Sequence, residues 1–101
     1  MSGHNYRDLD AWKKAVQLAV KAYNLTESFP ASQRYSLTQQ IQRAAVSVPS
    51  NIAEGQGRAT KPQFKYHAGV ARGSLFELET QFCIAEKLGY VTTNDIAQLN
   101  E

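Results

Sequence analysis

Apolar residues recur at steps of four and three from Phe64 to Ala85, and this repeat constrains the fold more than any other feature of the chain. Its members are Phe64, Ala68, Ala71, Leu75, Leu78, Phe82 and Ala85. Such steps place side chains on one face of an α-helix, and an unbroken run is typical of the seam of a helical bundle or coiled coil. We therefore predict a long helix that begins near Lys61 and lasts until Leu88.

Residues 9–28 form a second amphipathic segment. Two neighbouring apolar stripes run along it at helical spacing, and lysines and other polar residues fill the remaining arc. Asp8 is a good N-cap residue, and Phe29 is pushed out of the helical region by Pro30. We expect a helix from about Leu9 to Ser28.

A further helix is expected to begin at residues 32–35 and to continue to Glu54. Its apolar residues stay in helical phase across Pro49, which lacks the amide that would bond to the carbonyl of Ala45. We therefore predict that Pro49 kinks this helix without ending it.

Two capping signals mark the starts of the remaining helices. Thr60 and Gln63 have the spacing of a capping box, and Thr92 with Asp95 caps a last helix of about two turns. The prediction is an all-α fold, an up-and-down antiparallel four-helix bundle with a short or truncated fourth helix. Residues 1–101 form one domain, with residues 1–7 flexible. Because two turns cannot cover a core lined by three long helices, either a neighbouring subunit covers the rest or the chain is a shortened version of a longer protein.

Composition narrows the class of protein. The 101 residues are 43% hydrophobic and 20% charged, as is ordinary for a folded domain. There is no apolar run near the roughly 20 residues that span a bilayer, and no signal peptide, so we expect a cytoplasmic protein without a membrane partner.

We expect Cys83 to be a buried thiol, since Phe82 and Ile84 flank it. Most of Tyr6, Tyr35, Tyr66 and Tyr90 are expected to seal the edge of the core.

Charge is unevenly distributed along the chain. Residues 1–76 carry ten Lys or Arg against four acids, whereas residues 77–101 carry one Lys against five acids. Such polarity can steer an anionic partner, or it can dock the basic part of one subunit on the acidic part of another. The composition does not decide between these two interpretations.

Polar residues follow one face of the helix that contains Pro49 and form a polar stripe. Two interpretations of this polar stripe stay open. As a structural feature, the stripe forms a hydrogen-bonded network between helices or subunits, with members Gln40, Arg43, Ser47, Asn51, Glu54, Ser74 and Glu77. As a recognition surface, its cations contact phosphates together with other basic residues, and the candidate nucleic-acid-binding residues are Lys13, Lys14, Lys21, Arg43, Arg58, Lys61, Lys65 and Arg72.

Enzyme chemistry is not indicated. A di-iron bundle needs Glu-x-x-His pairs, and Glu54, Glu77 and Glu86 each lack the histidine three residues later. There is no Cys and His cluster, no nucleophile with an evident base and no phosphate-binding glycine loop. We therefore expect no catalytic residue, metal, cofactor or small-molecule substrate, and we place His67 at the surface or in an interface.

The pattern as a whole resembles a known family, the four-helix-bundle proteins encoded within intervening sequences of bacterial 23S ribosomal RNA genes, with relatives that are accessory proteins of diversity-generating retroelements. The matching residues are Leu9, Trp12, Tyr23, Phe29, Pro30, Tyr35, Leu37, Gln40, Arg43, Ala44, Ala45, Ser47, Pro49, Asn51, Ile52, Ala53, Glu54, Gly55, Gly57, Arg58, Ala71, Gly73, Ser74, Glu77, Leu88, Gly89 and Tyr90. The resemblance implies a four-helix bundle, a ring-like homopentamer and nucleic-acid binding without known catalysis. Gln33, Ser36 and the short last helix depart from the family pattern.

Two functional hypotheses follow. The first is a non-enzymatic oligomeric accessory protein that binds RNA or DNA. The second is a structural or protein-binding oligomeric scaffold that does not bind nucleic acid. Salt-dependent binding separates them, because phosphate contacts lose affinity steeply with salt.

Overall fold

The computed structural model describes residues 5–58 and 60–100, and these form an elongated bundle of 48 × 22 × 18 Å. The helices are α1 (Asp10–Thr26), α2 (Leu37–Gln56), α3 (Lys61–Lys87) and α4 (Thr93–Leu99), and short 3-10 helices η1 (Tyr6–Asp8) and η2 (Ala31–Gln33) precede α1 and α2. Residues 1–4, part of the segment predicted to be flexible, lie outside the described residues.

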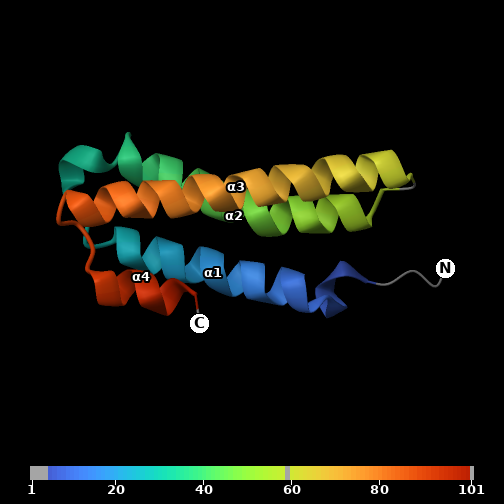
Figure 1. Cartoon of the computed structure of the whole chain (residues 1–101), viewed down its shortest axis with the longest axis horizontal. Helices are drawn as coiled ribbons and strands as arrows, with labels where there is room; N and C mark the ends of the chain where they lie inside the picture. The colour runs from blue at the N-terminus through green and yellow to red at the C-terminus, as the bar shows by residue number, and fades with distance from the viewer. Residues whose placement is uncertain (1–4, 59, 101) are drawn as a thin grey trace.

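Successive helices run in opposite directions, which confirms the up-and-down four-helix bundle (Figure 1). The α2–α3 connection lies at the same end as the start of α1, while the α1–α2 and α3–α4 connections lie at the other end. Helix α2 is central because it packs against both α1 and α3, whereas α4 packs on α1.

The core combines small residues, mostly of α1 and α2, with the larger side chains of Ile41 on α2 and of Leu78 and Phe82 on α3. Ala22, Ile41, Ala45 and Ala85 are fully buried, and Phe82 is the largest side chain among those with almost no exposed surface. Alanines let the helix axes approach, so the larger side chains of α3 fill the space between α1 and α2.

The predicted bounds of α3 are confirmed at both ends. The Thr60 hydroxyl accepts a hydrogen bond from the Gln63 amide, which is the threonine half of the predicted capping box. At the other end, Gly89 has a φ of +83°, a left-handed conformation that costs glycine little and that turns the chain toward α4. The capping box predicted for the last helix is complete, with Thr92 and Asp95 bonded reciprocally.

Three local predictions are wrong. The N-cap of α1 is Leu9 and not Asp8, because residues 6–8 form a separate 3-10 turn. Helix α2 begins at Leu37, later than expected, because the chain after Pro30 first makes η2. Cys83 is exposed: the next residue along a helix is rotated by about 100°, so burial of Phe82 turns Cys83 away from the core.

Helix α2 continues unbroken through Pro49, as predicted, and the Pro49 ring is buried. The kink itself stays a prediction. No helix within residues 5–58 and 60–100 is long and apolar enough to cross a membrane.

Candidate functional site

The polar stripe of α2 faces α3, and part of it forms a network of hydrogen bonds between the two helices. The Ser74 hydroxyl of α3 donates to the Ser47 hydroxyl of α2 over 2.7 Å. The amide nitrogen of Asn51 donates to the backbone oxygen and to the hydroxyl of Ser47, at 2.9 and 3.1 Å. Ser74 is buried, and Ser47 and Asn51 are half-buried.

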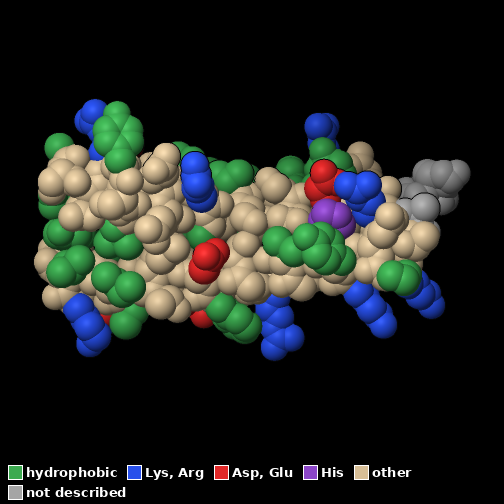
Figure 2. All heavy atoms as spheres, turned by 90° about the horizontal axis from the view of Figure 1, so that it is seen from above, with side chains coloured by type: hydrophobic (Ala, Val, Ile, Leu, Met, Phe, Trp, Pro, Cys, Tyr) green, Lys and Arg blue, Asp and Glu red, His purple; other side chains and the backbone are tan. Residues whose placement is uncertain are grey.

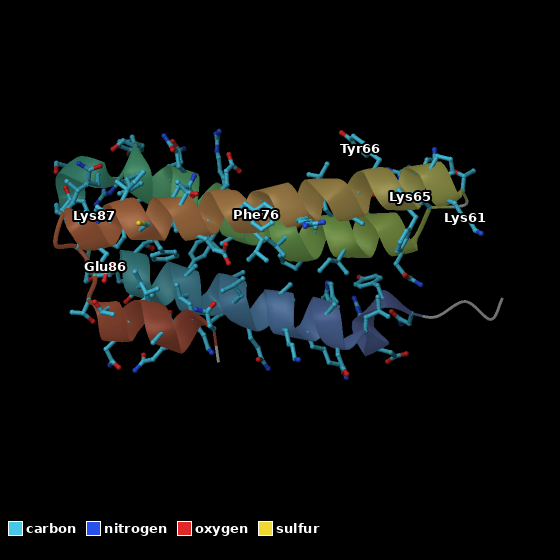
Figure 3. The ribbon with its side chains drawn as sticks, viewed as in Figure 1. Lys61, Lys65, Tyr66, Phe76, Glu86 and Lys87 are labelled. Carbon is cyan, nitrogen blue, oxygen red and sulfur yellow. The ribbon has the colours of Figure 1, made fainter. Side chains whose placement is uncertain are left out.

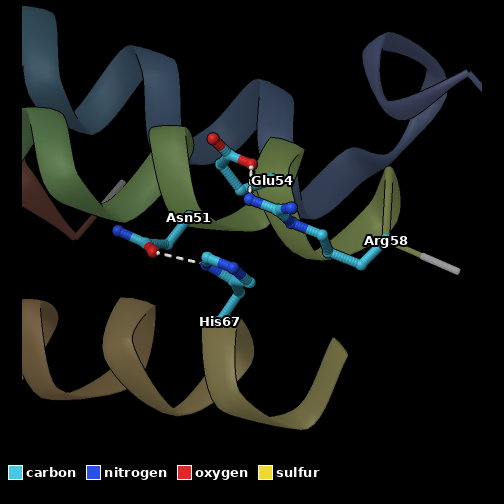
Figure 4. A network of polar contacts seen from close by, with 4 residues as sticks. All are labelled: Asn51, Glu54, Arg58 and His67. Atoms are coloured by element: carbon cyan, nitrogen blue, oxygen red, sulfur yellow. Dashed lines mark hydrogen bonds and ion pairs between the residues drawn. The ribbon is translucent and has the colours of Figure 1, made fainter. Parts of the chain in front are cut away.

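His67 extends this network to the surface (Figure 4). Its Nδ1 lies 3.0 Å from the side-chain oxygen of Asn51. Because the Asn51 nitrogen is committed to the backbone carbonyl of Ser47, which can only accept, its oxygen must face His67. That oxygen also can only accept, so Nδ1 carries a proton and the ring orientation is set from α2.

A glycine makes this contact possible. A side chain at Gly55 would place its Cβ 3.1 Å from the Cβ of His67 and 3.4 Å from the backbone oxygen of Phe64. The first turns of α3 therefore approach the last turns of α2 closely, and the imidazole reaches Asn51.

One turn further along α2, Arg58 and Glu54 form an ion pair of 3.0 Å. Their side chains are 44% and 54% exposed, so the pair adds little to stability. Among the residues that the structure describes, one guanidinium nitrogen of Arg58 makes a hydrogen bond, which leaves the other donors available.

The structure thus brings together Ser47, Asn51 and Ser74 of the residues predicted for a structural network. Glu54 pairs with Arg58, and the other members, Gln40, Arg43 and Glu77, are exposed and form no ion pair within the described residues. The stripe is therefore buried in its middle and open at both ends.

The candidate phosphate-binding residues divide into two kinds. Lys21 has a structural partner, since its ammonium group donates to the Gln98 backbone oxygen over 3.1 Å in the last turn of α4, where a cation is favoured. The others are exposed, namely Lys13, Lys14, Arg43, Arg58, Lys61, Lys65 and Arg72. Arg72 lies over the ring of Phe76, 5.5 Å from its centroid.

Folding concentrates positive charge at one end of the bundle. The half that contains the α2–α3 connection, residues 5–17, 47–58 and 60–73, carries seven Lys or Arg and three acids, a net charge of +4. The other half, residues 18–46 and 74–100, carries four Lys or Arg and five acids, a net charge of −1. Basic side chains project from both long edges of the face shown in Figure 2. We call the positive half the α2–α3 end.

His67 was predicted only at the surface or in an interface, and the buried position of Gln81 was not predicted. His67 and Gln81 lie seven residues before and after Ser74, so the three side chains fall on one line of α3. Gln81 is buried, and its side-chain oxygen accepts no hydrogen bond within the part of the chain that the structure describes. The step of seven residues from Ser74 to His67 and to Gln81 could have indicated that they share its side of α3. Apolar residues at neighbouring positions made this polar pattern hard to recognise.

Tyr35 and Tyr66 also differ from the expectation that most tyrosines seal the core. They are 81% and 66% exposed. Tyr6 and Tyr90 are half-buried, and Tyr90 packs against the ring of Phe29.

No group of three or more His, Cys, Asp or Glu among the described residues lies close enough to hold a metal ion.

Asn51→Ala should lower the free energy of unfolding by about 1–3 kcal/mol, because it removes two hydrogen bonds to Ser47 and leaves Nδ1 of the half-buried His67 without its partner. Gln40→Ala, an exposed change on the same stripe, should stay within about 0.5 kcal/mol of the parent. Chemical denaturation of both variants checks this. Equal losses would show that the Asn51 contacts add nothing to stability.

The chain is similar to a known protein family. Residues 7–101 match a protein-family model described as 23S rRNA-intervening sequence protein. A search of curated proteins found none that matches the chain.

Proposed function

Because the chain belongs to the family of 23S rRNA-intervening sequence proteins over residues 7–101, we propose that it is an oligomeric, non-enzymatic protein that binds RNA or DNA. The observation that carries this proposal is the net charge of +4 on the α2–α3 end, where exposed cations outnumber acids. Nucleic-acid affinity depends mainly on neutralised phosphates, which exposed Lys and Arg supply. A cytoplasmic location stays a prediction.

The oligomeric part of the proposal is supported by apolar surface outside the core. Val20 and Val46 of neighbouring helices are 55% and 44% exposed, and Ile84 near the end of α3 and Leu88 at its C-cap are 45% and 55% exposed. A second chain would cover such surface. The family resemblance favours a pentamer, which has a mass of about 56 kDa for five chains of 11.2 kDa.

The second candidate is an oligomeric scaffold that does not bind nucleic acid. The same exposed apolar side chains favour it, because an assembly could use them without any phosphate contact. In that case the charges at the two ends would dock subunits on one another.

Two measurements on the unmodified protein separate the candidates. We expect binding to fluorescently labelled RNA and DNA strands whose affinity falls steeply between 50 and 200 mM salt, as phosphate contacts require. Light scattering coupled to size exclusion should give a mass well above 11.2 kDa. An oligomer that binds no strand at low salt would favour the scaffold, and a monomeric mass at micromolar concentration would overturn the oligomeric part.

A further inference from the structure

The exposed ring of Tyr66 contacts His67, a member of the hydrogen-bond network between α2 and α3. It lies in the second turn of α3 at the α2–α3 end, and 66% of the residue is exposed. Figure 3 shows it projecting away from the bundle, with Lys61 and Lys65 leaving the same end of α3. An exposed ring beside cations matches the two needs of a nucleotide, a surface for the base and charge for the phosphate.

The Tyr66 ring is held in place by its neighbour. Its centroid lies 5.1 Å from that of the His67 ring, at an interplanar angle of 81°, the edge-to-face arrangement that aromatic pairs prefer. His67 is in turn oriented by Asn51, and Asn51 by Ser47 in the α2–α3 contact. A ring positioned before binding loses less conformational entropy when a ligand stacks on it.

Tyr35 provides the contrast within the same chain. It is 81% exposed at the opposite end of the bundle, and no aromatic pair or cation–π contact among the described residues includes it. Exposure alone therefore does not distinguish Tyr66. The contact with His67 and the local excess of cations do.

Cations flank Tyr66 on both sides of α3. Arg58, at the end of α2, lies on the same face as His67 (Figure 4), and its guanidinium keeps donors that Glu54 does not use. Lys65 precedes Tyr66 in the chain, and Lys61 lies one turn earlier. A strand that crosses the first turns of α3 therefore passes the Tyr66 ring and the two lysines at this end of the helix (Figure 3).

We propose that this end of the protein binds unpaired nucleotides, with one base stacked on Tyr66 and the adjacent phosphates on Arg58, Lys61 and Lys65. This inference rests on the proposed nucleic-acid binding and specifies its ligand as a single strand. In a duplex, neighbouring base pairs cover both faces of each base, so Tyr66 gains no stacking partner there. The lysines alone would attract single strands and duplexes alike.

Three probes isolate the stacking contribution. They are a labelled ten-nucleotide oligothymidine, an abasic strand with the same sugars and phosphates, and a ten-base-pair DNA duplex; an oligouridine of equal length tests RNA. The variants are Tyr66→Ala, Tyr66→Phe, which keeps the aromatic face, and Tyr35→Ala as the matched control. Fluorescence anisotropy gives the affinities over a salt series, and light scattering gives the mass of each variant.

We expect Tyr66→Ala to weaken oligothymidine and oligouridine binding by at least about 5-fold, the value of one stacked base at its lower limit. The salt slope should not change, because no charge is removed. Binding to the abasic strand and to the duplex should stay as in the parent, and Tyr66→Phe and Tyr35→Ala should bind all probes normally.

Each other result overturns the inference. An equal loss on the abasic strand, or no loss on oligothymidine, would exclude stacking while leaving the proposed nucleic-acid binding in place. A lower assembly mass for Tyr66→Ala but not for Tyr35→Ala would place the ring in a contact between copies. If the parent protein binds none of the probes at low salt, the proposed function fails together with the inference.

Discussion

Phe82→Ala is expected to lower the free energy of unfolding by about 3–5 kcal/mol, the usual range for a buried phenylalanine. Phe82 is 1% exposed and contacts the core between α1, α2 and α3, so its removal leaves a cavity that alanines on the facing helices cannot fill. For a domain of about 100 residues, each kcal/mol shifts the melting temperature by about 4–8 °C. A decrease of at least about 12 °C should follow, measured by circular dichroism at one fixed protein concentration.

Phe76→Ala is the matched control, since it removes the same side chain from the same helix. Phe76 is 52% exposed, and the guanidinium of Arg72 lies over its ring. Its loss should cost less than about 1 kcal/mol, the value of an exposed cation–π contact. Equal losses at positions 76 and 82 would mean that Phe76 is buried in an assembly.

The double variant Lys61→Gln/Lys65→Gln should weaken binding of a single-stranded oligonucleotide by about 25-fold at 0.1 M salt. Each phosphate contact to a single strand changes the slope of log affinity against log salt by about 0.7, so two contacts change it by about 1.4. Both lysines are exposed in the first two turns of α3, and their removal should leave folding unchanged. A salt series of anisotropy measurements gives both the affinity and the slope.

Arg34→Gln/Lys87→Gln removes two exposed cations from the other half of the bundle and keeps the same total charge as the first variant. It should change affinity far less if the α2–α3 end is the binding surface. Equal effects of the two double variants would mean that binding follows net charge and has no preferred end.

Local sequence signals predicted the helices well where each signal acts within a few residues. The steps of three and four from Phe64 to Ala85, with Thr60 before them, predicted α3 to within one residue at its C-terminal end. Capping at Thr92 and Asp95 was equally local and equally accurate. The start of α1 was predicted less accurately, because Asp8 belongs to the preceding turn η1 and is not the N-cap of α1.

The side of each helix that becomes buried was harder to predict. Periodicity gives the phase of side chains around their own axis, but it does not say how far along that axis a partner covers them. Phe64 belongs to the apolar seam of α3 and is nevertheless 47% exposed, because it lies in the first turn of α3, at the end of the bundle. Cys83 was assigned to the wrong side for a different reason: its apolar neighbours in the sequence lie about 100° away around the helix axis, so the burial of Phe82 does not predict that of Cys83.

The candidate site shows the same division between sequence and tertiary structure. The sequence by itself determined that α2 carries a polar stripe and that cations are concentrated before residue 77. Only the packing of α2 on α3 decided that Ser47 meets Ser74 and that Asn51 orients His67. The physical reason is that a hydrogen bond between helices depends on their register, which the close approach at Gly55 and the filling of the shared core set together.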